Sequence, residues 1–127
     1  MKKVIFILIL LFSFEFSLHA DTNRIISGKK SAKISIIVYE SLTCSHCADF
    51  HKSVYPNLKK DYIDTGLAKI EFRHFPLDLA AFNASKIVQC KKDQGLEILE
   101  ELYSNQQKWV KGDTIEQVNS NLKKFIN

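Results

Sequence analysis

The residues of this chain with the clearest chemical potential are two cysteines, Cys44 and Cys47, with a histidine, His46, between them. Two thiols at this spacing can exchange a disulfide, supply half of a zinc site or attach a haem. Haem attachment requires a histidine directly after the second cysteine, and Ala48 occupies that position. The sequence therefore leaves redox exchange and metal binding as the two reactive interpretations.

Metal binding has little support from the spacing of the other candidate ligands. Zinc requires four ligands, usually a second cysteine pair or a pair of histidines. His51, His74 and Cys90 are scattered along the chain and form no such pair. We therefore predict redox exchange, with no metal and no other cofactor. A plain structural disulfide is the simpler alternative, although so short a loop restrains the unfolded chain little.

The sequence around the cysteines predicts a strand, a turn and a helix. Residues 33–39 (KISIIVY) are rich in β-branched side chains, which is typical of a strand buried on both faces in the centre of a parallel sheet. A helical pattern then runs over residues 44–62, with Thr43 as its expected N-cap. Pro56 lies inside this segment and should kink or split it. The positions expected to face the core are Cys47, Phe50, Val54 and Leu58, whereas His51 is expected to be exposed.

A helix start favours the thiolate form of Cys44. The first backbone N–H groups of a helix are unpaired, and the helix dipole is positive at that end. The imidazole of His46 can add positive charge or a hydrogen bond, and each favours the anion. Cys47 lies one turn further in and is predicted to be the resolving thiol. Stabilising the thiolate stabilises the reduced pair, so the disulfide should be an oxidant.

The remaining sequence predicts an α/β fold. Residues 68–75 alternate between apolar and charged side chains, as in a strand that is exposed on one face and lies nearer the edge of the sheet. Strand, helix and strand in this order imply a parallel crossover. A short outer strand is expected at residues 23–27. Helical patterns follow at 79–92, 96–109 and 114–125. The core positions expected in these helices are Ile87, Cys90, Ile98, Leu99 and Leu102.

The first twenty residues have the order of a secretory signal peptide. Lys2 and Lys3 precede an apolar run over residues 4–14, and small residues lead to Ala20. We expect cleavage after Ala20 and a periplasmic protein without stable membrane insertion. An uncleaved signal that anchors the protein to the membrane is the alternative. The net charge of +4 is scattered as lysine pairs, which excludes a nucleic-acid-binding stripe.

Residues 38–90 resemble the DsbA-like thiol–disulfide oxidoreductases, which have a thioredoxin fold. The segments SLTCSHCADFH (41–51) and FRHFPLD (72–78) carry the resemblance. It implies that Cys44 is the exchanging sulfur, Cys47 the resolving thiol and His46 the group that stabilises the thiolate. It also implies reduced, unfolded exported proteins as substrates and a DsbB-type, quinone-linked membrane protein as reoxidant. A disulfide reductase or isomerase is the alternative within the family.

Two features depart from the family pattern. Many relatives hold a buried acid where this chain has Val38, and Glu40 is the candidate substitute as a proton relay. The family also has a cis-proline loop, two strands and a closing helix after its helical insertion. Neither Pro56 nor Pro76 occupies the cis-proline position, so a non-enzymatic truncated remnant is the rival interpretation. Cys90 is either half of a second disulfide of the family or an ordinary buried cysteine.

The predicted fold is thus a thioredoxin-like α/β fold with a helical insertion, incomplete at its C-terminal strands. Its expected parts are a signal peptide (1–20), an N-terminal arm or short edge strand (21–32), a β-α-β half with the cysteine pair (33–76) and a truncated helical insertion (77–127).

Overall fold

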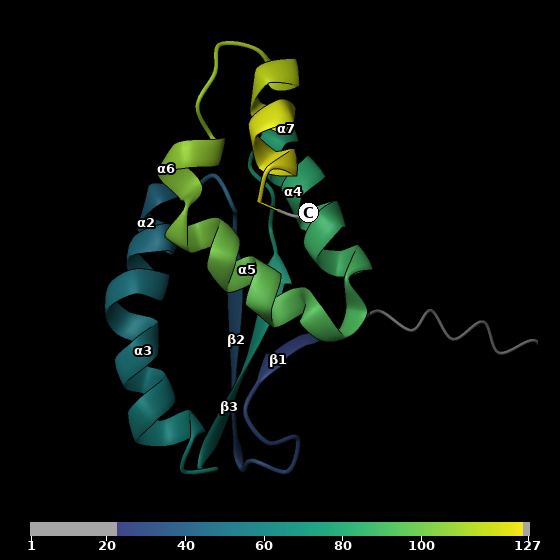
Figure 1. Ribbon diagram of the computed structural model, residues 1–127. Coiled ribbons are helices and arrows are strands. Elements are labelled where there is room, and N and C mark those ends of the chain that lie inside the picture. Colours follow the sequence, from purple (N-terminus) through teal and green to yellow (C-terminus); the bar gives the residue numbers. More distant parts are fainter. Residues whose placement is uncertain (1–22, 126–127) are drawn as a thin grey trace, which may run out of the picture.

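A three-stranded mixed sheet forms the centre of the structure, a computed structural model that describes residues 23–125. The predicted signal peptide lies outside the described residues. The strand order is β1-β3-β2 (Figure 1). The strands are β1 (Ile25–Ser27), β2 (Ile34–Glu40) and β3 (Ala68–His74). β3 pairs parallel to β2 and antiparallel to β1, so the expected parallel crossover and the expected outer strand are both confirmed.

A long helical segment, residues 45–63, connects β2 to β3. It consists of α2 (Ser45–Asp49), the π-helical η1 (Phe50–Val54), α3 (Tyr55–Leu58) and the π-helical η2 (Lys59–Ile63). Pro56 stands in the first turn of α3, directly after a π-helical turn. Proline has no N–H for the helical ladder, and π turns are a common way to accommodate such a break. Pro56 was expected to kink or split the helix, and the structure shows a change of helix type at this point instead.

The C-terminal half is helical, as predicted. Its helices are α4 (Leu79–Cys90), the 3₁₀ turn η3 (Lys92–Gln94), α5 (Gly95–Ser104), α6 (Gln106–Trp109) and α7 (Ile115–Lys123). Asp78 caps α4 by accepting a hydrogen bond from the N–H of Ala81, and Thr114 caps α7 in the same way. The predicted helix over 96–109 is divided at Asn105, which lies between α5 and α6.

The helices cover one face of the sheet (Figure 1). Val38 on β2 is paired with Phe72 on β3, and their side chains belong to the covered face. The opposite face carries Ile37 and Tyr39, which are 46% and 61% exposed. The described part of the molecule therefore has two layers, with the core between the sheet and the helices.

Two strand predictions are wrong, because the central strand and the edge strand are exchanged. The segment 33–39 was expected in the centre and buried on both faces, but β2 is an edge strand whose only described neighbour is β3. β3, expected near the edge, is central and mostly buried. A segment rich in β-branched residues is a good strand former, but the burial of that strand depends on which helices and strands pack against it.

Three residue-level predictions are also wrong. Thr43 does not cap the long helix, because Cys44 is the N-cap residue and the Thr43 hydroxyl donates elsewhere. Val54 is 53% exposed, since the π-helical turn rotates the sequence that follows it relative to a regular α-helix. Cys90 is exposed at the end of α4, and it forms no disulfide within residues 23–125. The other expected core positions are buried or packed against the core.

A tight turn at Gly28 joins β1 to the segment before β2. Its φ of +102° lies in the region that favours glycine. A Cβ at this position would stand 2.8 Å from Ile63 Cγ2 and 3.0 Å from the carbonyl oxygen of Ala68. The turn therefore needs a glycine both for its backbone conformation and for its contact with the end of the long helix.

Candidate active site

The two cysteines lie where β2 ends and the long helix begins. Cys44 is the N-cap residue of α2, with an extended backbone, and its carbonyl oxygen accepts the first helical hydrogen bond from the N–H of Ala48 at 3.2 Å. Cys47 lies one turn further along and packs against the core. Both thiols are partly buried. The chain thus places one sulfur at the open end of a helix and the other behind it.

The helix start lowers the pKa of Cys44. The backbone N–H of Cys47 is the largest influence, followed by the Cys47 thiol, and the N–H of His46 acts in the same direction. Partial burial and the negative charge of Asp49 oppose this shift without reversing it. A thiolate at this position is stabilised by unpaired helical N–H groups, as the sequence predicted.

The environment of Cys47 acts in the opposite direction. Burial is the main reason that the pKa of Cys47 is raised, and the negative charges of Cys44 and Glu40 add to it. Of two chemically identical thiols, the outer one therefore favours the anion and the inner one favours the proton. This asymmetry is what an exchanging thiol and a resolving thiol require.

His46 contributes to the site through its backbone. Its side chain is exposed, and the imidazole makes no hydrogen bond to any residue between 23 and 125. The lowered pKa of Cys44 owes part of its shift to the His46 N–H rather than to the ring. The predicted role of the imidazole stays a prediction.

A buried acid and a buried histidine lie beneath the cysteine pair. Glu40, the last residue of β2, is only 2% exposed, and a 2.8 Å hydrogen bond joins its Oε2 to Nε2 of His51. Burial raises the pKa of Glu40, although the hydrogen bond and the charge of His51 act against the shift. Val38, at the position expected for the acid, packs instead into the core.

The sequence prediction for His51 is wrong, because this side chain is buried rather than exposed. Its ring stacks on Tyr103 of α5, with centroids 4.2 Å apart and an interplanar angle of 19°. Phe72 of β3 lies on another side at 5.0 Å. A signal was present in the spacing: His51 follows Cys47 by four residues, so a helical face that buries one also buries the other.

The loop before Cys44 is held by the helical half of the chain. Gln106, the first residue of α6, is buried and donates through its Nε2 to the carbonyl oxygens of Leu42 and Cys44, both at 2.9 Å. The Thr43 hydroxyl donates to Oδ2 of Asp78 at 2.6 Å. Sequence reasoning missed Gln106, because no local pattern marks a side chain that bonds 62 and 64 residues away.

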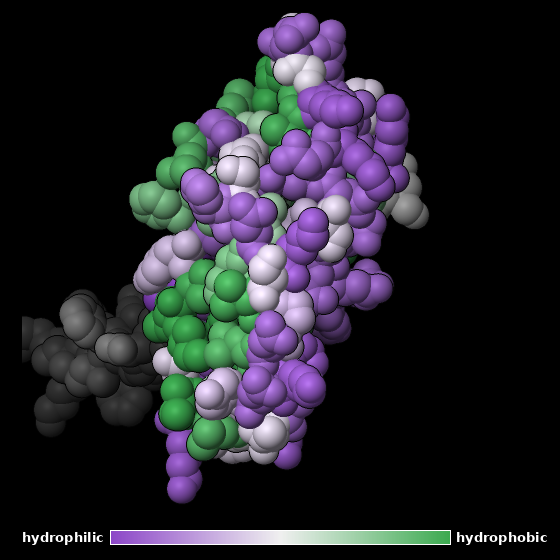
Figure 2. All heavy atoms as spheres, turned by 90° about the vertical axis from the view of Figure 1, so that its left-hand side faces the viewer, coloured by the Kyte–Doolittle hydropathy of each residue, from purple (hydrophilic) through white to green (hydrophobic). Residues whose placement is uncertain are grey.

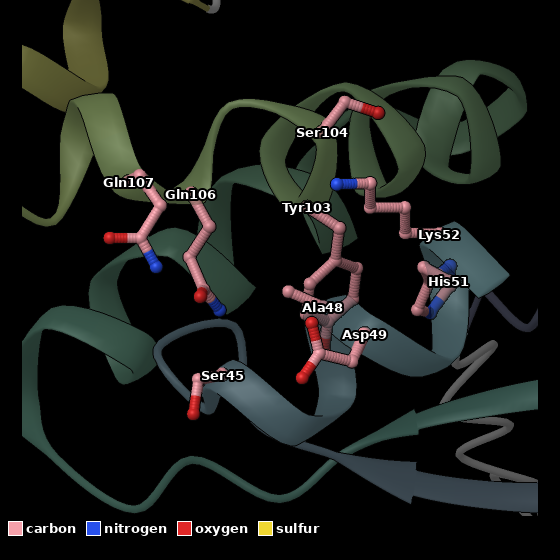
Figure 3. A pocket seen from close by; sticks show the side chains of 9 residues that line it. All are labelled: Ser45, Ala48, Asp49, His51, Lys52, Tyr103, Ser104, Gln106 and Gln107. Carbon is pink, nitrogen blue, oxygen red and sulfur yellow. The ribbon is translucent and has the colours of Figure 1, made fainter.

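A pocket of about 410 Å³ opens beside the start of the long helix (Figure 3). Ser45, Asp49 and Lys52 line it from the long helix, and Tyr103 and Gln106 line it from α5 and α6. The ring of His51 also borders it. The pocket therefore reaches the histidine of the buried acid–histidine pair.

The described residues contain no group of histidine, cysteine or acidic side chains that could hold a metal ion. Within residues 23–125, no helix is both long enough and apolar enough to cross a bilayer. The groups of this site that can react are the two thiols and the buried pair of Glu40 and His51.

Known proteins are similar to this chain both in sequence and in fold. A family model described as Thioredoxin matches residues 20–125. A Rickettsia bellii protein named "Putative protein-disulfide oxidoreductase" is 36% identical over 81 residues, which cover 64% of this chain and 31% of that protein. A Bacillus cereus protein named "Probable disulfide bond formation protein D" is 31% identical over 97 residues, covering 69% of this chain and 45% of that protein.

Among solved structures, Wolbachia pipientis alpha-DsbA1 is similar with a TM-score of 0.65 at 29% identity, covering 82% of this chain and 62% of that structure. The chain spans less than half the length of these two curated relatives. The match to the family model extends over most of the chain, the fold agrees, and the cysteine pair stands at the helix start. The chain belongs to the thioredoxin family, among its DsbA-like members.

Proposed function

We propose that this protein is a thiol–disulfide oxidoreductase that donates the Cys44–Cys47 disulfide to reduced proteins. The observation that carries the proposal is the position of the two thiols: Cys44 is the N-cap residue of α2, which lowers its pKa, and Cys47 packs against the core, which raises its pKa. A stabilised outer thiolate favours the reduced pair and so makes the disulfide an oxidant. The names of the matched Rickettsia and Bacillus proteins support the same class of activity.

Disulfide donation proceeds in two exchange steps. A substrate thiolate attacks Cys44 Sγ, the Cys44–Cys47 bond breaks, and the electron pair goes to Cys47 Sγ, which takes up a proton. A second substrate thiolate then attacks the substrate sulfur of the mixed disulfide and expels Cys44 as a thiolate. The substrate is oxidised to a disulfide, and the protein is left with Cys44 as thiolate and Cys47 as thiol.

Glu40 is the proposed proton donor to Cys47 in the first step. Its carboxyl group is buried, its pKa is raised by that burial, and its charge influences the pKa of Cys47. A general acid is most effective when its pKa lies near the working pH, and burial moves the pKa of a carboxyl group upward, toward that range.

The redox equilibrium of the Cys44–Cys47 pair with glutathione tests the proposed direction of exchange. We expect a potential more oxidising than the glutathione pool of about −220 to −260 mV. A potential as reducing as that of thioredoxin, about −270 mV, would contradict donation and favour a reductase. A disulfide that shuffles scrambled substrates faster than it oxidises reduced ones would favour an isomerase.

Alkylation with iodoacetamide across a pH series tests the assigned roles of the residues. Cys44 should react at a pH clearly below the free-thiol pKa of about 8.5, while Cys47 should remain protected. His46→Asn should move the midpoint of Cys44 upward if the imidazole helps to stabilise the thiolate. Equal reactivity of Cys44 and a small-molecule thiol across the series would refute the role of Cys44.

The proposed setting is the periplasm, reached through cleavage of residues 1–20, with exported proteins as substrates and a DsbB-type membrane protein as reoxidant. The positively charged start and the apolar run of the sequence support export. Fractionation of cells that produce the full chain, with mass spectrometry of its mature N-terminus, tests both export and cleavage. A protein that melts cooperatively yet exchanges no disulfide would instead be the non-enzymatic alternative.

A further inference from the structure

Six buried polar side-chain atoms have no hydrogen-bond partner among residues 23–125, and three of them belong to His51 and two residues in contact with it. These three are Glu40 Oε1, His51 Nδ1 and the hydroxyl oxygen of Tyr103. Buried polar groups are nearly always paired, because an unpaired one is costly. The contacts of His51 with Glu40 and Tyr103 therefore bring together unpaired groups that can give and accept protons.

His51 stands between the acid and the pocket. One ring nitrogen shares a 2.8 Å hydrogen bond with Glu40, and the ring itself borders the pocket beside Asp49 and Lys52 (Figure 3). Glu40 in turn is close enough to Cys47 for its charge to influence that thiol. The groups therefore follow one another in the order thiol, carboxyl, imidazole, pocket.

Tyr103 fixes the imidazole in place. Its ring stacks on His51 at 4.2 Å, and burial raises the pKa of its hydroxyl well above its usual range, with the charges of Glu40, Cys47 and Cys44 adding to this. The hydroxyl consequently stays protonated and can only donate or accept hydrogen bonds. The stacked ring restricts the plane of the His51 imidazole, in which Nε2 faces Glu40.

We propose that His51 is a positioning residue that carries protons between Glu40 and the pocket during disulfide exchange. The inference rests on the proposed function and extends it, since Glu40 alone has no described route to water. A carboxyl group that is 2% exposed must recover its proton after each donation, and its hydrogen-bonded neighbour is His51.

The proton balance of one reduction by glutathione shows what the pair must do. A glutathione thiolate forms a mixed disulfide with Cys44 and releases Cys47 as a thiolate. The Glu40 carboxyl group protonates Cys47, and protonated His51 then returns a proton to the Glu40 carboxylate. Neutral His51 takes up a proton from water at the pocket, and a second glutathione thiolate releases Cys44 and forms oxidised glutathione.

The titratable surroundings of His51 come from three elements. Glu40 faces it from β2 and Tyr103 from α5, and the long helix contributes Cys47, Asp49, Lys52 and Tyr55. From β3 the ring neighbour of His51 is Phe72, which carries no charge, and the titratable His74 lies opposite Glu40 in the strand register. Glu40 and His51 are hydrogen-bonded and should titrate as a coupled pair with two macroscopic steps.

The test measures how fast glutathione reduces the oxidised full chain between about pH 5 and pH 9, with each rate divided by the thiolate concentration. We expect this rate constant to fall with rising pH in two steps for the parent protein. For His51→Gln we expect a single step and a rate at neutral pH that is lower by about tenfold, because the glutamine can hydrogen-bond Glu40 but carry no proton. His74→Gln is the control: this imidazole lies opposite Glu40 in the strand register but makes no hydrogen bond to it, so the variant should keep both steps.

A two-step profile and an unchanged rate in His51→Gln would overturn the inference. If that variant does not fold, ¹³C NMR of the Glu40 carboxyl group in the parent decides: coupled titration with the His51 ring supports the relay, and a single independent step refutes it. If the parent disulfide reacts no faster than that of a linear CSHC peptide, the proposed function fails instead, and the NMR titration still tests the pair.

Discussion

The most unusual single residue of the site is Glu40, a carboxyl group buried at the end of a strand. Burial disfavours its charged form more strongly than His51 favours it, so its pKa is raised. The folded state therefore binds the Glu40 proton more tightly than the unfolded state does. The stability linked to this proton is complete below the unfolded pKa of about 4.3 and is lost as the pH rises through the folded pKa.

Replacing this acid should accordingly make the protein more stable at neutral pH. Glu40→Gln removes the charge and keeps a group that can bond His51. We expect its gain in unfolding free energy over the parent to be absent near pH 4 and to grow with pH, by about 1.4 kcal/mol for each unit of pKa elevation. Urea unfolding across a pH series measures the gain. Exposed Glu97→Gln is the control, and an equal, pH-independent difference for both variants would contradict the expectation.

At the scale of elements, the cysteine loop depends on the helical half of the chain. Gln106 of α6 supplies hydrogen-bond donors to two carbonyl oxygens on either side of Thr43. These bonds explain how a loop of four residues can hold the sulfur of Cys44 at the helix start. The helices after β3 thus belong to the site as well as to the core.

Gln106→Leu should destabilise the protein by roughly 2 kcal/mol, because it removes the side-chain donor from the buried carbonyl oxygen of Leu42 and one of the two donors to that of Cys44. It should also raise the pH at which Cys44 is alkylated, since the loop can then move away from the helix start. Denaturant unfolding and iodoacetamide titration measure the two effects. Gln107→Leu alters the exposed neighbour and should leave both values near those of the parent. Equal behaviour of the two variants would show that the loop is held by other contacts.

The Gly28 turn offers a second test at this scale. Gly28→Ala forces an alanine to a φ of +102° and a Cβ against Ile63 and Ala68, so we expect a loss of about 1–3 kcal/mol. Gly95→Ala is the matched control: its φ is not positive, and its new Cβ would meet neighbours at 3.4 and 3.5 Å. It should be neutral or slightly stabilising. A small loss at position 28 and a larger one at position 95 would contradict this account.

The sequence predicted most elements because their signals are local. Strand composition, the cysteine spacing and the alternation of β3 all act within a few residues, and the three later helices end close to the predicted positions. The order of the strands, the burial of His51 and the bonds of Gln106 depend on contacts between distant segments. The π-helical turns also changed which side of the long helix is buried, and a regular helical pattern cannot anticipate that change.

On the scale of the whole molecule, the β2 edge of the sheet face opposite the helices is apolar and accessible, while charged side chains of β3 lie beside it. Ile37 and Tyr39 are exposed on β2, and no described strand pairs with the outer edge of β2. Figure 2 shows hydrophobic side chains gathered toward one side of the surface, while hydrophilic side chains cover the other. An accessible apolar edge strand is prone to pair with other chains.

Ile37→Lys should therefore reduce self-association without lowering the melting temperature, because this side chain contributes little to the core. Analytical ultracentrifugation at several protein concentrations measures the association. Val54→Lys is the control: it adds the same charge at another exposed apolar residue, away from the sheet, and should not change the sedimentation. Equal effects of both substitutions would mean that net charge, rather than the β2 edge, governs association.

Asp78 ties the cysteine loop to the start of α4 with its two carboxylate oxygens. Oδ1 accepts from the N–H of Ala81 at 2.7 Å, and Oδ2 accepts from the Thr43 hydroxyl at 2.6 Å. An asparagine here would keep one acceptor and present a donor in place of the other. Both bonds are kept only if the residue at position 78 is short and has two acceptor oxygens. A substitution at position 43 that removes the hydroxyl would remove the need for the second acceptor.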